Sequence, residues 1–336
     1  MKKFITLLLN LALIYSCSTS NDGNGNSTTT VVPIAPSNLT GTVASTTQIN
    51  LSWTDNSTNE TGFKIERKTG TGTYAVVVTT AADVNTFVNT GLTPGTTYTY
   101  RVYSNNAVGN SLTYSNEISL TTTSYTVTDL DGNSYQSATN CGLTYTKTNL
   151  NVSKYSDGTT IPQVTDHTQW NNLTTGAWCY YNNDSTNGIT LGKLYNWYAV
   201  AGIYDDASAA NPALRKKLAP TGWHIPTNAE WTQLGDCLGG FDVAGGKMKS
   251  TGTIEAGTGF WLTPNTGATN ESGFTGLPGS CRVTGFSIIG DGGYWWSSTE
   301  YTSTYVHNRC LIYDSDKLWS TDGNPNNGFS VRCFKN

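Results

Sequence analysis

The sequence predicts two folded domains, an N-terminal all-β sandwich and a C-terminal α+β domain, preceded by a leader and a polar tether. Three observations support this prediction. Short runs of alternating apolar and polar residues recur between Pro36 and Thr123, separated by polar turns, as in antiparallel strands. After Ser124 the pattern changes and mixes short strands with amphipathic helical stretches. The length of 336 residues also suits two domains.

The leader, Met1–Ser16, begins with Lys2 and Lys3 and continues as an apolar run. This pattern is typical of a secretory signal peptide, and the run is too short to span a bilayer comfortably. Ile14–Cys17 (IYSC) resembles a bacterial lipobox. We therefore expect Cys17 to be lipidated and to become the mature N-terminus. The alternative is an ordinary signal peptide with an incidental cysteine.

The tether, residues 17–32, has almost no large apolar side chain before Val31, so it cannot offset the entropy of ordering. Acyl chains on Cys17 would each add about 0.8 kcal/mol per buried CH₂, enough for stable anchoring. We expect a lipid-anchored protein of the bacterial cell envelope, at the outer membrane. No acidic run follows Cys17, so which face of the membrane it occupies is left open.

The composition argues against a nucleic-acid partner. The chain has a formal net charge of −4, and only 12% of its residues are charged. A nucleic-acid-binding protein needs a basic face to neutralise phosphates. The abundance of neutral polar residues fits an exported protein instead.

Residues 33–123 carry two recognisable motifs, the stretch SWTD around Trp53 and the turn LTPGTTY at 92–98. They resemble a fibronectin type III domain, which implies an immunoglobulin-like sandwich with Trp53 and Tyr98 in its core. The Tyr98 hydroxyl is then expected to bond to backbone, as in a tyrosine corner. We interpret this domain as a spacer; the alternative is a binding module of its own.

The second domain, residues 125–336, is organised around GWHIPTNAEWTQL at 222–234. Trp223–Ile225 alternates as a short strand does, and Pro226 ends it. Thr227 is a good N-cap, and Glu230 follows at the spacing of a capping box. The motif therefore predicts a strand, a proline and a capped helix.

Together with YWWSSTEY at 294–301 and GFSVRC at 328–333, this motif resembles the Fibrobacter succinogenes major paralogous domain. That domain is similar to the formylglycine-generating-enzyme branch of the C-type-lectin-like fold. The resemblance implies an α+β, C-type-lectin-like domain. It implies no particular activity.

Aromatic and polar residues in the later part of this domain are candidates for ligand binding. Trp295 and Trp296 should point to opposite faces of a strand, so we expect one indole at the surface, where a sugar face can stack on it. The loop-rich stretch 239–293 adds polar groups. The alternative is that both tryptophans belong to the core. The candidate ligand-binding residues are Trp295, Trp296, Trp261, Asn265, Glu271 and Arg282.

Six cysteines besides Cys17 suggest up to three disulfides in an oxidising compartment. The positions of Cys281 and Cys310 are usually aromatic in the family, so the resemblance implies that these two cysteines face each other, and we expect a 281–310 bridge. Ala219 stands where the family usually has a cysteine. Cys237 is therefore the expected partner of Cys333.

The chain lacks HExxH and GxSxG motifs, and its three histidines are scattered. Formylglycine-generating enzymes bind copper with a pair of cysteines that cannot be placed here. We expect no catalytic residue, no metal site and no cofactor. The oxygen-rich stretches 129–133 and 182–188 are more typical of turns, with a structural calcium ion as the alternative.

We therefore expect an envelope lipoprotein that acts as a non-catalytic binding or adhesion module. Its partners would be the membrane, through the lipid anchor, and a glycan, another surface polymer or a surface protein. One alternative is a structural envelope component without a soluble ligand. The other is an oxidoreductase of the formylglycine-generating type.

Overall fold

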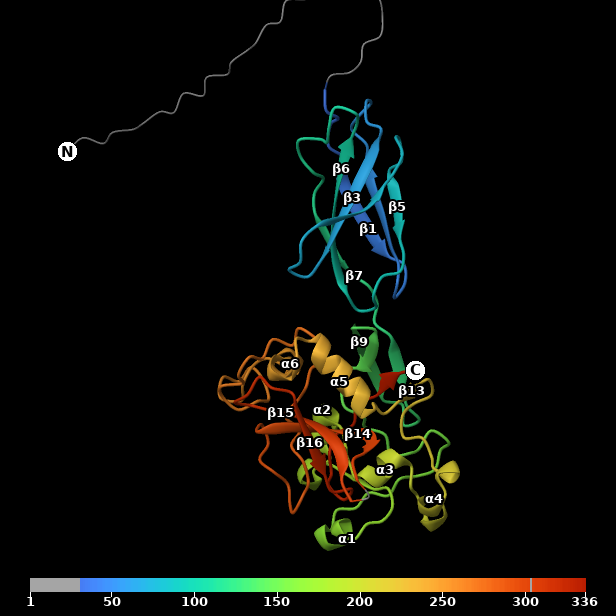
Figure 1. Cartoon of the computed structure of the whole chain (residues 1–336), viewed down its shortest axis with the longest axis vertical. Helices are drawn as coiled ribbons and strands as arrows, with labels where there is room; N and C mark the ends of the chain where they lie inside the picture. The colour runs from blue at the N-terminus through green and yellow to red at the C-terminus, as the bar shows by residue number, and fades with distance from the viewer. Residues whose placement is uncertain (1–30, 303) are drawn as a thin grey trace, which may run out of the picture.

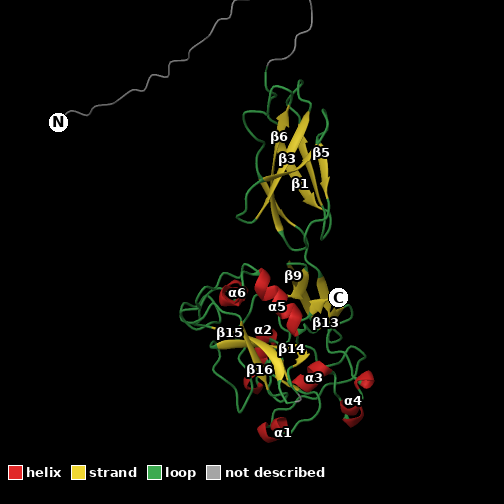
Figure 2. Cartoon of the chain, viewed as in Figure 1, coloured by secondary structure: helices red, strands yellow, loops and turns green. Residues whose placement is uncertain are grey.

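The computed structural model describes residues 31–302 and 304–336. It shows two domains in succession, an all-β sandwich and a larger domain in which loops predominate (Figures 1 and 2). The expected signal segment 1–16, Cys17 and nearly all of the tether lie outside the described residues. Among the described residues, no helix combines the length and apolar character needed to cross a membrane.

The N-terminal domain consists of two antiparallel sheets. The first has the order β1-β2-β5 and the second the order β4-β3-β6-β7. The strands are β1 (Ser37–Val43), β2 (Ile49–Thr54), β3 (Gly62–Thr69), β4 (Ala75–Thr79), β5 (Thr86–Asn89), β6 (Thr97–Asn105) and β7 (Ile118–Thr121). The domain is therefore the all-β sandwich that the alternating pattern predicts.

The sandwich core follows from that alternation. Tyr98, Tyr100 and Val102 of β6 are all buried, as period-two alternation requires of one face. Trp53 packs edge-on against Phe63 of the other sheet, with ring centroids 5.7 Å apart. The Tyr98 hydroxyl accepts a hydrogen bond from the backbone N–H of Thr93 at 2.9 Å. Trp53 and Tyr98 therefore lie where the sequence analysis expects them.

The C-terminal domain contains three small sheets, with orders β13-β17-β10-β9-β8, β14-β15-β16 and β11-β12. The strands are β8 (Thr126–Thr128), β9 (Ser134–Asn140), β10 (Leu143–Thr146), β11 (Trp178–Cys179), β12 (Leu194–Tyr195), β13 (Trp223–His224), β14 (Gly292–Glu300), β15 (Val306–Ile312), β16 (Trp319–Gly323) and β17 (Phe334–Lys335). The first and last strands share the five-stranded sheet, so the two ends of the domain meet (Figure 1).

The helices of this domain are short. They are α1 (His167–Asn171), α2 (Thr186–Leu191), α3 (Trp197–Ala201), α4 (Asp206–Ala210), α5 (Asn228–Cys237) and α6 (Phe241–Met248), with 3₁₀ turns η1 (Tyr181–Asn183) and η2 (Pro212–Leu214). Helix α3 begins at Trp197, directly after β12 and Asn196. The cause is the Asn196 side chain, which accepts from the backbone N–H of Ala199 at 3.1 Å and so caps the helix there.

Helix α5 begins as the capping-box spacing predicts. The Thr227 hydroxyl accepts from the backbone N–H of Glu230 at 3.2 Å, and the Glu230 carboxylate accepts from that of Thr227 at 2.8 Å. The same carboxylate contacts His224 Nε2 at 2.7 Å. The strand, proline and capped helix therefore form one local unit.

Three arginines, Arg282, Arg309 and Arg332, are almost completely buried. In the described part of the chain none of them forms an ion pair with a carboxylate. Arg332 donates to Asn149 Oδ1 and the Thr146 carbonyl, both at 2.7 Å. It also donates to the carbonyls of Phe274 and Thr275 at 2.8 and 3.0 Å. The arginines therefore satisfy loop carbonyls that regular structure would otherwise pair.

The disulfide pairing differs from the expected one. Cys141 is bonded to Cys237, which joins the β9–β10 turn to the end of α5. Cys237 is therefore not the partner of Cys333, and that prediction is wrong. Cys281 and Cys310 do not form the expected bridge either, and both are buried free thiols, as are Cys179 and Cys333. Burial raises the pKa of Cys310 to about 12 and that of Cys179 to about 11.

The free thiols allow a direct count. In residues 31–336, native protein at pH 8 should show no fast reaction with a thiol reagent, because burial removes both access and thiolate. Unfolded without reductant, the same protein should show four thiols, and after reduction six. A count of two before reduction would show a second disulfide and would contradict the assignment of four free thiols.

The capping box should make stability depend on acid pH. Burial raises the pKa of Glu230, but hydrogen bonds from Thr227 and His224 lower it more, so that its pKa lies below the ordinary 4.5. Its stabilising contribution is then fully present above pH 4.5 and is lost as pH falls through the folded-state pKa. Between pH 6 and 3, the free energy of unfolding of Glu230→Gln should fall less steeply than that of the wild type. The free energy of unfolding would be measured by urea titration at each pH. An equal fall with pH in the wild type and in Glu230→Gln would rule this linkage out.

Candidate binding groove

Both tryptophans of the YWWSSTEY motif are core residues. Trp295 is 1% exposed and Trp296 is fully buried, so the expected surface indole is absent from β14. The Trp295 indole donates to Asn149 Oδ1, and that of Trp296 to the Tyr195 carbonyl, both at 2.8 Å. The two side chains do point to opposite faces, but a separate core cluster covers each face. The prediction that either one stacks on a sugar is wrong for this conformation.

The other predicted ligand residues are also mostly inaccessible. The Trp261 indole donates to Ser250 Oγ and the Gly276 carbonyl. Asn265 donates to two carbonyls, and Arg282 donates to the carbonyls of Val164, Thr165 and Asp166 at 2.8 to 3.0 Å. These three side chains therefore hold loops together and do not face a ligand.

Glu271 is the exception, because its side chain is 65% exposed. It lines a hollow of about 300 Å³ with Asn270 and Thr139, next to sandwich residues such as Thr69. The structure therefore separates Glu271 from the other five predicted residues, which do not form one site.

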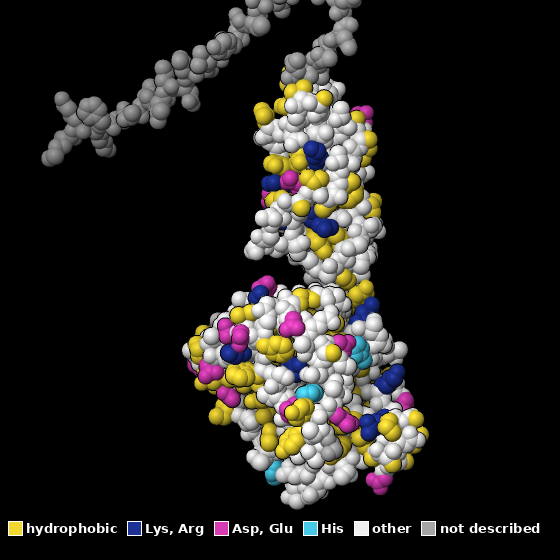
Figure 3. All heavy atoms as spheres, in the orientation of Figure 1, with side chains coloured by type: hydrophobic (Ala, Val, Ile, Leu, Met, Phe, Trp, Pro, Cys, Tyr) yellow, Lys and Arg dark blue, Asp and Glu magenta, His cyan; other side chains and the backbone are white. Residues whose placement is uncertain are grey.

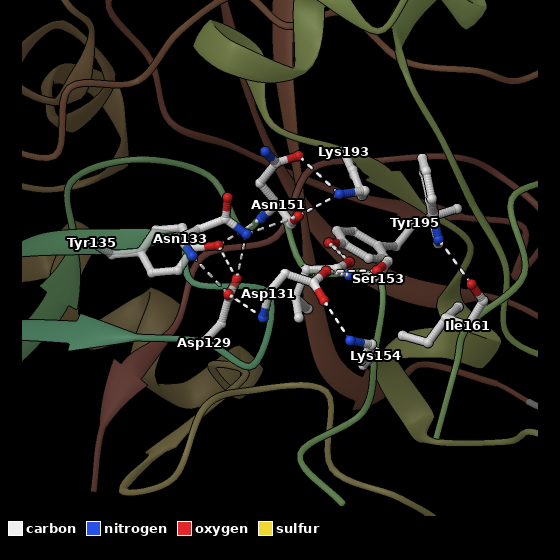
Figure 4. A network of polar contacts seen from close by, with 12 residues as sticks. Asp129, Asp131, Asn133, Tyr135, Asn151, Ser153, Lys154, Ile161, Lys193 and Tyr195 are labelled. Atoms are coloured by element: carbon white, nitrogen blue, oxygen red, sulfur yellow. Dashed lines mark hydrogen bonds and ion pairs between the residues drawn. The ribbon is translucent and has the colours of Figure 1, made fainter. Parts of the chain in front are cut away.

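Of the two oxygen-rich stretches, 129–133 forms a turn, whereas 182–188 runs from the 3₁₀ turn η1 into the first turn of α2. Asp129 accepts from the backbone N–H groups of Asp131 and Asn133 and from the Tyr135 hydroxyl (Figure 4). Asp131 accepts from Ser153. Asp184, in the second stretch, accepts from the N–H and hydroxyl of Thr186. Asp129 and Asp184 accept from nearby backbone N–H groups, as turn-forming residues do, whereas Asp131 accepts from Ser153, which is distant in the sequence.

Two buried lysines have lowered pKa values, a property often found in active sites. Desolvation lowers the pKa of Lys249 to about 8 and also lowers that of Lys193. Lys249 Nζ donates to the Ile312 and Ser315 carbonyls at 3.1 and 2.8 Å. Lys193 donates to the Asn151 carbonyl (Figure 4). Its Nζ atom lies 4.5 Å from the Trp178 ring centroid. Both ammonium groups are thus hydrogen-bonded to backbone carbonyls.

A hollow of about 360 Å³ lies beside β13, and we call it the His224 groove. Its apolar floor is formed by Val200, Leu218, Ala219, Trp223 and Ile225. Its polar rim is formed by Lys216, Lys217, His224, Thr227, Ser298 and Asn336. An apolar floor with a few polar groups around it is the usual composition of a binding site.

The rim of the His224 groove has a fixed part and a free part. His224 Nδ1 contacts Asn336 Oδ1 at 2.8 Å, and its Nε2 contacts Glu230, so the imidazole is held on both sides. Lys216 forms an ion pair with Asp157. Lys217 and Ser298 are exposed, so their side chains are free to meet a ligand. The groove therefore offers one exposed cation, a hydroxyl and a preset imidazole.

The sequence analysis missed the His224 groove, because its walls come from segments far apart in the chain. β17 pairs with β13 and so brings Asn336 next to His224. The backbone N–H of Ser298 donates to the Pro226 carbonyl at 2.9 Å, and this hydrogen bond holds Ser298 at the groove. One local clue was present: a polar His224 between two buried residues, six residues before a capping glutamate.

Several solved structures are similar to part of this chain. The FN1–FN3 domains of chicken CNTN1 are 21% identical, over 27% of this chain and 32% of that one, with a TM-score of 0.26. Titin domains A168–A170 are 23% identical over the same shares, with a TM-score of 0.25. The third fibronectin III domain of human KIAA0343 protein is 19% identical, over 31% of this chain and 94% of that one, with a TM-score of 0.26.

This chain thus spans about a third of the first two structures. TM-scores this low support no conclusion about function. No curated protein matches the chain. Family models are more informative. The fibronectin type III model matches residues 34–121, and the Fibrobacter succinogenes major domain model matches residues 141–335. Because the second match covers more than half of the sequence, the chain belongs to the Fibrobacter succinogenes major domain family, with a fibronectin type III domain in front.

Proposed function

We propose that this protein is a lipid-anchored protein of the cell envelope that binds a polar surface polymer, such as a glycan, without catalysis. The fibronectin type III domain acts as the spacer, and the C-terminal domain, of C-type-lectin-like fold, holds the ligand in the His224 groove. The anchor is inferred from Ile14–Cys17 in the sequence. The lectin-like fold is inferred from the family motifs and is supported by the sheet that joins the two ends of the domain.

The observation that carries this proposal is the composition of the His224 groove. Its polar groups surround an apolar floor, and they come from elements that the core and the capping box hold in place. A preset site loses little conformational entropy when a ligand binds, so even a shallow groove can bind a repeating polymer. The rest of the visible surface is mostly neutral and polar, with scattered charges (Figure 3).

The buried thiols favour this proposal over an oxidoreductase of the formylglycine-generating type. Copper binding and thiol chemistry both need accessible thiolates. Cys281 and Cys310 are 3% and 5% exposed, and burial raises the pKa of each thiol. Neither side chain offers the accessible thiolate that such chemistry requires.

Filling the groove should weaken binding while leaving the fold intact. Ser298→Trp puts an indole on the exposed rim, and we expect it to weaken binding at least about tenfold, or ~1.4 kcal/mol. Ser320→Trp makes the same change at an exposed position of β16, outside the groove, and should bind normally. Residues 31–336 would be screened against neutral and uronic-acid polysaccharides, followed by calorimetry on any polymer that binds.

The role of charge can be separated in the same screen. Lys217→Ala should weaken binding to uronic-acid polymers and reduce its dependence on salt, with little effect on neutral ones. Binding that Ser298→Trp leaves unchanged would contradict the groove as the site. No binding to any polymer would favour a structural envelope component without a soluble ligand.

A further inference from the structure

Three carboxylates meet at one end of the sandwich. Asp55 follows β2, Glu60 precedes β3, and Asp83 lies in the loop between β4 and β5. One carboxylate oxygen from each residue lies within 4.8 Å of the other two. The β2–β3 and β4–β5 loops thus bring three acidic groups to one point, far from the His224 groove in the sequence and in another domain.

Glu60 is the unusual member of this cluster. It is only 8% exposed, although glutamate is rarely buried without a partner. Its Oε2 atom is shielded from solvent and accepts no hydrogen bond within the described residues. Its other oxygen receives only a long bond, 3.4 Å, from the backbone N–H of Asp83. A buried carboxylate oxygen without a donor is costly, so its position indicates a missing partner.

No side chain of the described chain supplies that partner. The ion pairs of residues 31–302 and 304–336 use other carboxylates and none of these three. Three like charges therefore face one another, with one of them largely shielded from water. Such an arrangement is unfavourable unless a cation is shared among them.

We propose that Asp55, Glu60 and Asp83 bind a calcium ion. The donors are all carboxylate oxygens, which favours a hard cation over zinc or copper. Calcium binds oxygen at about 2.3–2.6 Å, so oxygens around one ion lie no more than about 5 Å apart, as these do. Asp83 is exposed and Asp55 half-buried, so water can fill the remaining positions of a flexible calcium shell. Magnesium demands a stricter octahedron and suits this site less well.

The ion would join two loops at the end where the chain enters the sandwich (Figure 1). In the same region the Asn59 side chain, next to Glu60, donates to the Val31 carbonyl at 3.0 Å. Asn106, in the loop after β6, donates to that carbonyl as well, also at 3.0 Å. Calcium would therefore stiffen the point at which the sandwich meets the segment that precedes it. This inference does not depend on the proposed groove.

The test uses the full chain in detergent, freed of metal with EDTA and dialysed, and titrated with CaCl₂ alone in a calorimeter. We expect one ion per chain, with a dissociation constant of about 10⁻⁴–10⁻³ M, as in extracellular modules. Glu60→Gln and Asp83→Asn should each weaken binding about tenfold or more. Glu117→Gln removes the same charge from an exposed site of the same domain and should bind as the wild type does.

Thermal unfolding supplies a second readout with opposite signs. Without calcium, Glu60→Gln should unfold at a higher temperature than the wild type, because the mutual repulsion is reduced. With 10 mM CaCl₂ the order should reverse, because only the wild type gains from the ion. The proposal would be overturned if the wild type bound no calcium, or if Glu60→Gln and Asp83→Asn both bound it fully. It would also be overturned if Glu117→Gln lost as much calcium affinity as they do, or if calcium left the order of unfolding temperatures unchanged.

Discussion

The buried guanidinium group of Arg332 holds together parts of the C-terminal domain that regular structure does not connect. It links the end of β10, the loop at Asn149 and the Phe274–Thr275 segment through four hydrogen bonds. Asn149 Oδ1 accepts from both Arg332 and the Trp295 indole, so the same group also fixes β14. Among the described residues, oxygens of backbone carbonyls and of the Asn149 amide accept from the cation, and no carboxylate pairs with it. The Phe274 ring centroid lies 4.3 Å from it.

A domain with so many loops must satisfy its buried carbonyls without long strands or helices. Arg282 and Arg309 solve the same problem elsewhere, with bonds to carbonyls and amide oxygens. A guanidinium carries five donors in a rigid plane, so one side chain can organise several loop segments. The family motif GFSVRC contains Arg332, and the structure gives that arginine a physical role.

Local features were predictable from the sequence, and features set by distant contacts were not. The sandwich strands and the Thr227–Glu230 capping box depend on residues a few positions apart, and both were predicted correctly. The alternation of Trp295 and Trp296 was also correct, but alternation shows only that two side chains point apart. Whether either is exposed depends on what covers each face of β14, and here two separate core clusters do so. The partner of Cys237 likewise depends on where the β9–β10 turn packs.

The last residue of the sequence belongs to a wall of the His224 groove. Asn336 is held there by its backbone N–H, which donates to the Gly222 carbonyl at 3.1 Å, and by its contact with His224. An affinity tag or a fusion partner joined to Asn336 would start inside the groove wall and would obstruct the groove. Recombinant protein for binding work should therefore carry its tag at the N-terminal side, where the sandwich keeps it a whole domain away.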